Sequence, residues 1–317
     1  MTTAHTSPAC LPNRRKSRRR PGVLALLLAP LLWGPGPLGG QPATDIVVLD
    51  LHPHLDHVHA AALIQVTDRE GYDNQPWFLD HDRLLFSSDR AGGQTDVFRF
   101  TLSDGRVEPV TRTPESEYSP RLRPSHESFG VVRVEMDGVT QHLYAYPLEG
   151  GEPRLLLPEL ADIGYYAWAG PDRVLLFRVG DPSSLHLADL ETGEVRLIQE
   201  GVGRSLQSVP GTDHVSFVDR SDPENWRLRR LDPGTGEAET VAPLPTGAEE
   251  HAWMSDATAL MGHEGVLYRS TGDPDHPWHP ILDLEGVAGP FSRIAVSPNR
   301  AMLRIAIVVE RSEEEGG

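Results

Sequence analysis

The chain has 317 residues, of which 38% are hydrophobic and 24% charged, so it has enough apolar content for a folded core. Its 46 acidic residues outnumber 29 basic ones, and the resulting net charge of −17 argues against nucleic acid as a partner. The single cysteine, Cys10, excludes intrachain disulfides and cysteine-based zinc sites, while 30 Gly and 28 Pro residues favour a turn-rich all-β fold.

Residues 1–43 differ in composition from the rest of the chain. They contain six basic residues and no acidic one, followed by the apolar run VLALLLAPLLW (23–33) and the helix-breaking run GPGPLGGQPA (34–43). A basic segment followed by a short apolar one is typical of an export signal. The apolar run is interrupted by Pro30 and falls well short of the ~20 residues that a spanning helix needs. We therefore predict a signal peptide with linker and a periplasmic or secreted location. The alternative is an uncleaved N-terminal anchor, which would be the chain's only membrane contact.

The segment HPHLDHVH, residues 52–59, is rich in groups that bind metal ions. It places four imidazoles and a carboxylate at short spacing, a donor set that suits Zn²⁺ or another divalent metal. The candidate ligands are His52, His54, Asp56, His57 and His59. The alternative is a solvated hairpin loop between the strand-like runs 45–51 and 61–67, with histidines that titrate near ~6.5.

A repeat of 41 to 45 residues organises the chain from residue 71 onward. Six short apolar runs mark it, namely residues 84–86, 129–132, 174–177, 215–218, 259–261 and 302–305. A second strand with alternating character follows each of the first five runs, at residues 96–102, 142–148, 184–190, 226–232 and 265–271. Tight turns, mostly rich in Gly, and a fourth strand complete each of these five units. Four antiparallel strands at this period predict the blades of a β-propeller.

The last unit, 291–310, contains only two strands before the chain ends. The runs 45–51 and 61–67 match the two missing strands. We therefore predict a six-bladed β-propeller over residues 44–311, in which the last blade combines strands from both ends of the chain. Residues 312–317 are predicted to be an acidic flexible tail.

One blade carries a resemblance to a known family. The run GYDNQPWFLDHDRLLFSSDRAGGQTDVFRFTLSDGRVEPVT (71–111) resembles the WD-repeat-like blades of the TolB family of periplasmic propellers. Its most specific part is Phe86-Ser87-Ser88-Asp89-Arg90 followed by Gly92-Gly93. The resemblance implies a propeller and, more loosely, an envelope location. TolB also carries an α/β domain before its propeller, and the six units leave no room for one here.

The segments between blades supply the candidate binding face. In propellers such connections crowd one face around the central channel, and aromatic residues with a few charges are typical of protein-binding hot spots. The candidates are Tyr72, Asp73, Tyr118, Tyr165, Tyr166, Arg204 and His251. The alternative is that some of these side chains pack between blades; we expect this of Trp168 and Trp253, with Tyr166 a further candidate.

Sequence motifs for catalysis are missing. No lysine follows Lys16, and the chain has neither a G-x-S-x-G elbow nor an H-E-x-x-H zinc motif, so no catalytic residue is assigned. We therefore expect a non-catalytic module that binds an envelope protein or peptide and needs no cofactor. The alternatives are a hydrolase or lyase with a cross-blade, metal-dependent site, and a sugar-binding module.

Overall fold

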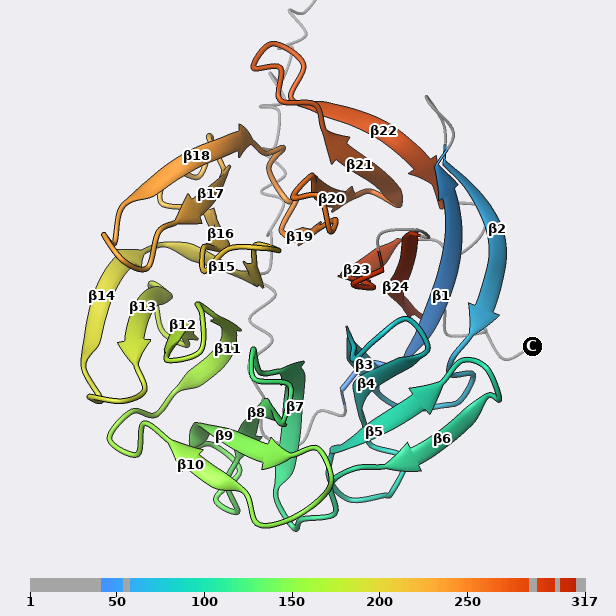
Figure 1. The fold of residues 1–317 in the computed structure, drawn as a ribbon, viewed down its shortest axis with the longest axis vertical. Helices are drawn as coiled ribbons and strands as arrows, with labels where there is room; N and C mark the ends of the chain where they lie inside the picture. Colours follow the sequence, from blue (N-terminus) through green and yellow to red (C-terminus); the bar gives the residue numbers. More distant parts are fainter. Residues whose placement is uncertain (1–40, 54–57, 285–289, 300–302, 312–317) are drawn as a thin grey trace, which may run out of the picture. The chain divides into compact units, whose positions relative to one another are not determined.

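Six four-stranded antiparallel sheets form a ring in the computed structural model, and all described secondary structure is strand (Figure 1). The structure describes residues 41–53, 58–284, 290–299 and 303–311. These residues belong to one compact unit, 34–317. The prediction of a six-bladed β-propeller is confirmed.

The blades are numbered here in chain order, and each is given from its innermost to its outermost strand. Blade 1 contains β3 (Asp73–Phe78), β4 (Arg83–Ser88), β5 (Asp96–Thr101) and β6 (Arg106–Pro109). Blade 2 contains β7 (Ser116–Leu122), β8 (Ser128–Val134), β9 (Gln141–Pro147) and β10 (Arg154–Leu156). Blade 3 contains β11 (Ile163–Trp168), β12 (Arg173–Arg178), β13 (Ser184–Asp189) and β14 (Val195–Glu200).

The remaining blades follow the same order, with one change of connectivity. Blade 4 contains β15 (Val202–Ser208), β16 (Val215–Asp219), β17 (Arg227–Leu231) and β18 (Ala238–Pro243). Blade 5 contains β19 (Glu250–Trp253), β20 (Ala259–His263), β21 (Val266–Ser270) and β22 (Trp278–Asp283). Blade 6 contains β23 (Phe291–Val296), β24 (Leu303–Glu310), β1 (Thr44–Pro53) and β2 (Val58–Gln65), so it combines strands from the two ends of the described chain.

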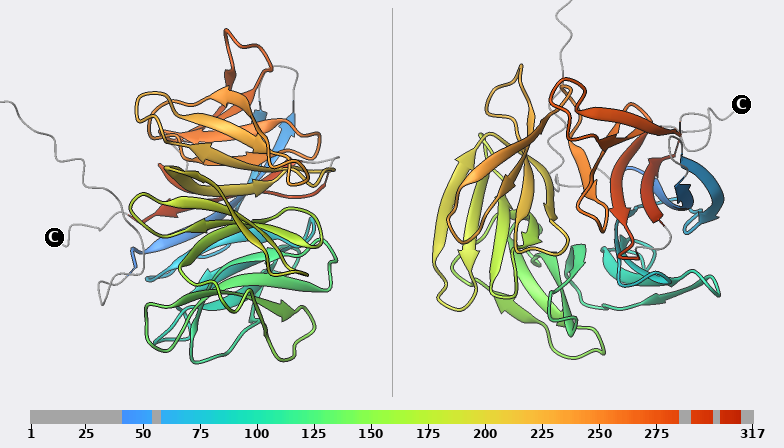
Figure 2. Two further views of the ribbon diagram at one scale, coloured as in Figure 1. Left: turned by 90° about the vertical axis from the view of Figure 1, so that its left-hand side faces the viewer. Right: turned by 45° about the horizontal axis from the view of Figure 1, so that its top comes forward.

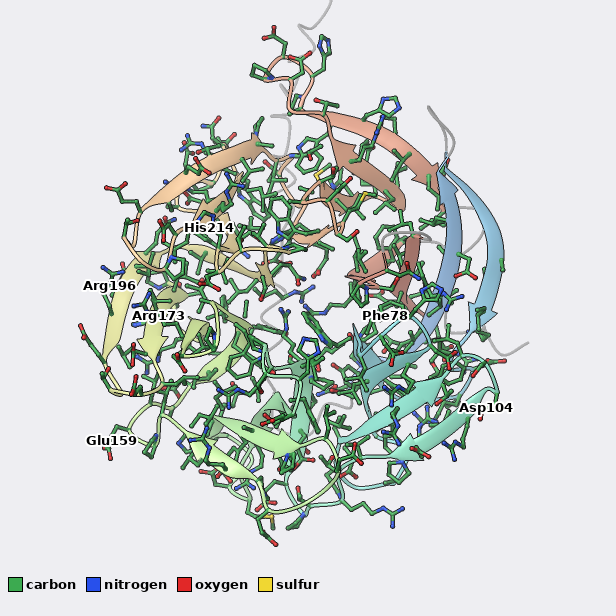
Figure 3. All side chains as sticks on the ribbon, in the orientation of Figure 1. Phe78, Asp104, Glu159, Arg173, Arg196 and His214 are labelled. Atoms are coloured by element: carbon green, nitrogen blue, oxygen red, sulfur yellow. The ribbon has the colours of Figure 1, made fainter. Side chains whose placement is uncertain are left out.

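The hydrophobic core is divided into six clusters, one between each pair of neighbouring blades. Strand β1 shows how the sequence achieves this, because its alternate residues face opposite sides of the sheet. Val47 and Leu49 pack toward blade 5, whereas Ile46 and Val48 pack toward blade 1. The side views show the sheets side by side, and side chains fill the spaces between them (Figures 2 and 3). Each sheet therefore buries both faces against its neighbours.

A glycine marks one place where two blades approach closely. A Cβ atom on Gly130 in β8 would lie 2.5 Å from Trp168 Cζ2 and 2.7 Å from the Tyr166 hydroxyl, both in blade 3. We expect Gly130→Ala to lower the free energy of unfolding by about 1–3 kcal/mol, the usual cost of overpacking. Urea denaturation measures this change. Gly234→Ala in an exposed turn is the control, and an equal effect of the two substitutions would contradict the close packing at Gly130.

Candidate functional site

Most of the residues predicted for the binding face lie in the innermost strands. The expectation that the segments between blades are loops throughout is wrong, because an innermost strand begins within residues 68–75, 112–119, 158–166, 200–206 and 245–253. Asp73 lies in β3, Tyr118 in β7, Tyr165 and Tyr166 in β11, Arg204 in β15 and His251 in β19, whereas Tyr72 directly precedes β3. Six of these seven residues therefore lie in the strands that surround the channel axis.

The innermost strands are irregular, and for that reason they could not be recognised as strands from an alternation of apolar and polar residues in the sequence. In five of the six blades the pairing between the first and second strands contains a register shift, as a β-bulge produces. Gln75 and Ser119, at two of these shifts, have positive φ values of 57° and 54°. The Ser119 N–H donates to Gln75 Oε1 at 2.7 Å, which links β3 to β7. A bulge reverses the faces on which later side chains lie, so period-two alternation fails here.

Four of the predicted residues, Tyr72, Asp73, Tyr166 and His251, are buried. The Tyr166 hydroxyl donates to the Ser119 carbonyl oxygen of blade 2 at 3.0 Å. Its ring meets Trp168 edge to face, and both side chains belong to the cluster between blades 2 and 3. Asp73 pairs with Arg90 at 3.1 Å and with Arg69 at 3.4 Å. The contacts of Tyr166 join blades 2 and 3, and the ion pairs of Asp73 hold the segments that precede β3 and follow β4. Tyr166 and Asp73 therefore stabilise the fold.

His251 forms a buried pair with Ser216. Its Nε2 lies 2.8 Å from Ser216 Oγ, and the Trp253 indole N–H donates to the same oxygen at 2.8 Å. Burial lowers the pKa of His251 to about 3, so the imidazole is neutral at physiological pH. Ser216 is fully buried, and His251 Nδ1 has no partner among the residues that the structure describes. In this arrangement the serine is not accessible to a substrate.

Two predicted residues, Tyr165 and Arg204, take part in a polar layer across the channel. Arg293 donates to the Tyr165 hydroxyl at 3.0 Å and lies 3.6 Å from Glu250. Arg204 pairs with the same Glu250 at 3.2 Å. We call these four side chains the Tyr–Arg layer; they come from blades 3, 4, 5 and 6. Burial, followed by the nearby Tyr165, raises the pKa of Tyr72, which therefore stays protonated beside this layer.

A cavity of about 350 Å³ lies on the axis and is lined by all six innermost strands. Tyr165, Glu250 and Arg293 of the Tyr–Arg layer belong to its lining. The lining extends to residues in the turns that follow the innermost strands, namely Pro210, Ser255, Ser297 and Pro298. The cavity is thus displaced toward the ends of the innermost strands, whereas the predicted face consisted of the segments that precede and begin them.

The cavity combines an aromatic and aliphatic wall with the cationic side chains of Arg121 and Arg293. Trp77, Phe78, Ile294 and Val296 provide apolar surface. The guanidinium of Arg121 lies 5.1 Å from the Trp77 ring centre, a cation–π distance, and Arg121 Nη1 donates to the Leu206 carbonyl oxygen at 2.8 Å. Sequence reasoning missed Arg121 and Trp77, because their position on the axis depends on the bulges of β3 and β7.

The predicted metal ligands fall largely outside the part of the chain that the structure describes. His54, Asp56 and His57 lie in the segment that is not described, and for His52 and His59 only the backbone pairing between β1 and β2 is described. Among the described residues, no group of three or more His, Cys, Asp or Glu side chains is placed to hold a metal ion.

The same described residues contain no helix long and apolar enough to cross a membrane.

Comparisons with known proteins find the same fold without sequence relatives. No protein-family model and no curated protein matches the chain. A structure assigned as TolB from Agrobacterium tumefaciens has a TM-score of 0.66 at 14% identity, covering 86% of this chain and all of that one. TolB from Acinetobacter baumannii has a TM-score of 0.55 at 11% identity, covering 84% of this chain and 81% of that one. A chain of a nidogen/laminin complex has a TM-score of 0.55 at 10% identity, covering 80% of this chain and 97% of that one. The predicted likeness to TolB propellers is confirmed for the fold.

Proposed function

We propose that this chain is an exported, non-catalytic propeller that binds a peptide segment of a partner protein in its axial cavity. The observation that carries the proposal is the cavity itself, to which every blade contributes. Ligand pockets commonly combine an apolar lining with a few convergent polar groups, and the side chains of Trp77, Arg121 and Glu250 provide that combination here. The proposed location in the cell envelope is supported by the signal-like composition of residues 1–43 and by the fold shared with TolB structures.

The geometry of the polar groups favours binding over catalysis. The His251–Ser216 pair is buried and lies outside the lining of the cavity. The charged groups that line the cavity are Arg121, Glu250 and Arg293, and Glu250 already pairs with arginines. A carboxylate held in this way stabilises the lining and is poorly placed to accept a proton from a substrate.

A substitution that blocks the cavity tests the proposal. Ser255 lines the cavity in the turn between β19 and β20, whereas Ser125, in the equivalent turn between β7 and β8, is exposed and does not line it. We expect affinity capture from a native envelope extract to recover a stoichiometric partner with the wild type and with Ser125→Trp. Ser255→Trp should lose that partner, because the indole would occupy part of the cavity.

The captured partner is then titrated in purified form against the three proteins by calorimetry. A loss of at least about tenfold in affinity for Ser255→Trp alone would support binding in the cavity. Equal affinity of the two variants would contradict it, as would the absence of any partner for a folded wild type. In that second case the hydrolase or lyase alternative gains weight.

A further inference from the structure

The charge of the cavity differs in sign from that of the chain. Arg121, Arg293 and Glu250 are the charged residues of the lining, so its formal charge is positive although the chain has a net charge of −17. Glu250 is already engaged by Arg293 at 3.6 Å and by Arg204 at 3.2 Å. The excess positive charge therefore belongs to Arg121.

Arg121 has only neutral partners in the described part of the chain. Its Nη1 donates to the Leu206 carbonyl oxygen and, at 3.4 Å, to Gln207 Oε1, and its guanidinium faces the rings of Trp77 and Tyr166. Among the described residues Arg121 forms no ion pair at 4.0 Å or less, and the Glu250 carboxylate attracts it only from a greater distance. A guanidinium has five N–H donors, so most of those of Arg121 are free for a ligand.

The environment of Arg121 also disfavours an isolated cation. Burial lowers the pKa of Arg121 to about 10, although the guanidinium still carries its charge at neutral pH. A charge removed from water is costly unless it is paired. An anion in the cavity would supply the missing partner, and the fork of N–H groups fits a carboxylate through two parallel hydrogen bonds.

We propose that Arg121 binds a ligand carboxylate in the axial cavity while Trp77, Phe78 and Ile294 contact an apolar group next to that carboxylate. The inference rests on the proposed function, in which the carboxylate is the C-terminus of the bound peptide. Only one charge of the lining is in excess, which suits a monoanion better than a phosphate. The volume of about 350 Å³ lies at the small end of the range of ligand pockets, about 300–1,000 Å³, and therefore suits the end of a peptide.

The test compares probes that differ only in the carboxylate, using the full chain. The first pair of probes is a pool of short random-sequence peptides ending in Phe, with either a free carboxylate or an amide at the C-terminus. The second pair is hydrocinnamate and its amide, which represent a free small molecule. We expect the free-acid peptides to bind about tenfold or more tightly than the amides, because hydrogen bonds to charged groups are strong.

Substitutions assign that preference to one side chain. In Arg121→Gln we expect the preference for the free acid to disappear, and in Arg121→Lys to be reduced, because lysine keeps the charge but not the fork. Arg227→Gln makes the same change at an exposed position and should keep the preference. Thermal melting shows whether Arg121→Gln folds, and the acid–amide comparison on the wild type needs no variant.

The outcomes separate this inference from the proposed function. Equal binding of acid and amide peptides to the wild type would overturn the carboxylate site and leave peptide binding intact. Arg121-dependent binding of hydrocinnamate without any binding of peptides would support the carboxylate site and contradict the peptide function. Binding of neither probe would overturn both.

Discussion

Removal of residues 45–67 is expected to abolish cooperative folding of the propeller. Blade 6 would lose β1 and β2, and β24 would become an exposed edge strand with unpaired N–H and C=O groups. The expected result is a broad, non-cooperative thermal transition and aggregation. A variant that lacks residues 1–33, which precede the propeller, should melt like the full chain.

The physical reason is the position of β1 between two blades. Eight residues of β1, Thr44–Leu51, pair with β24, and the Arg304 guanidinium forms a bidentate ion pair with Asp50 across the two strands. The apolar side chains of β1 complete the hydrophobic clusters toward blade 5 and toward blade 1. The strand therefore contributes to two interblade cores as well as to its own sheet.

Point substitutions give a sharper version of this prediction. Val48 in β1 is fully buried, whereas Leu63 in β2 is 45% exposed. Val48→Asp should destabilise the protein by about 3–5 kcal/mol, because it places an unpaired charge between blades 6 and 1. Leu63→Asp should change the free energy of unfolding by less than about 1 kcal/mol. Guanidinium denaturation measures both changes. Equal effects, or a deletion variant that melts like the full chain, would contradict a stabilising role of β1.

The second and third strands of the blades could be predicted because burial on both faces gives them apolar runs. The run 174–177 lies within β12, and the run 184–190 agrees closely with β13. These strands need only local pairing and a tight turn, both of which leave a signal in neighbouring residues. The composite blade 6 could be predicted because the last unit lacks two strands and the start of the propeller supplies two.

The channel could not be predicted in the same way, because its geometry depends on contacts across the ring. Arg293 meets Tyr165 across 128 residues of sequence, and the bulges in β3 and β7 determine that Trp77 and Arg121 line the cavity. Polar residues in an irregular strand look like loop residues in the sequence. For that reason the predicted face included residues near the axis but missed Arg121 and Arg293, the two cationic side chains of the cavity lining.

Glu117 in β7 is a fully buried carboxylate with no basic partner in the described part of the chain. The hydroxyls of Thr111 and Tyr146 donate to it at 3.0 and 3.1 Å, and Thr113 also donates. Burial raises the pKa of Glu117 from 4.5 to about 7 against the lowering effect of these hydrogen bonds, and the nearby Asp96 raises it further. The folded protein therefore retains a proton at Glu117 that the unfolded chain loses near pH 4.5.

The sign of the pH dependence follows from this difference in bound protons. Below pH 4.5 both states are protonated at Glu117, and its ionisation costs no stability. Between pH 4.5 and 7 the unfolded chain binds fewer protons, so the free energy of unfolding falls as the pH rises. Above pH 7 the loss is complete. A shift from 4.5 to about 7 corresponds to a total on the order of 3 kcal/mol.

Glu117→Gln should remove this loss, because the amide has nearly the same shape and no charge to desolvate. We expect the variant to exceed the wild type by about 2–3 kcal/mol in the free energy of unfolding at pH 8, and to differ little from it at pH 4.5. Urea denaturation across this range measures both curves, with Glu194→Gln in an exposed turn as the matched control. The hydroxyls around residue 117 can rotate to accept hydrogen bonds from the amide, so the gain does not require repacking. A wild-type curve that runs parallel to that of Glu117→Gln from pH 4.5 to 7 would contradict the raised pKa, because it would show that the folded and unfolded states bind the same number of protons at Glu117.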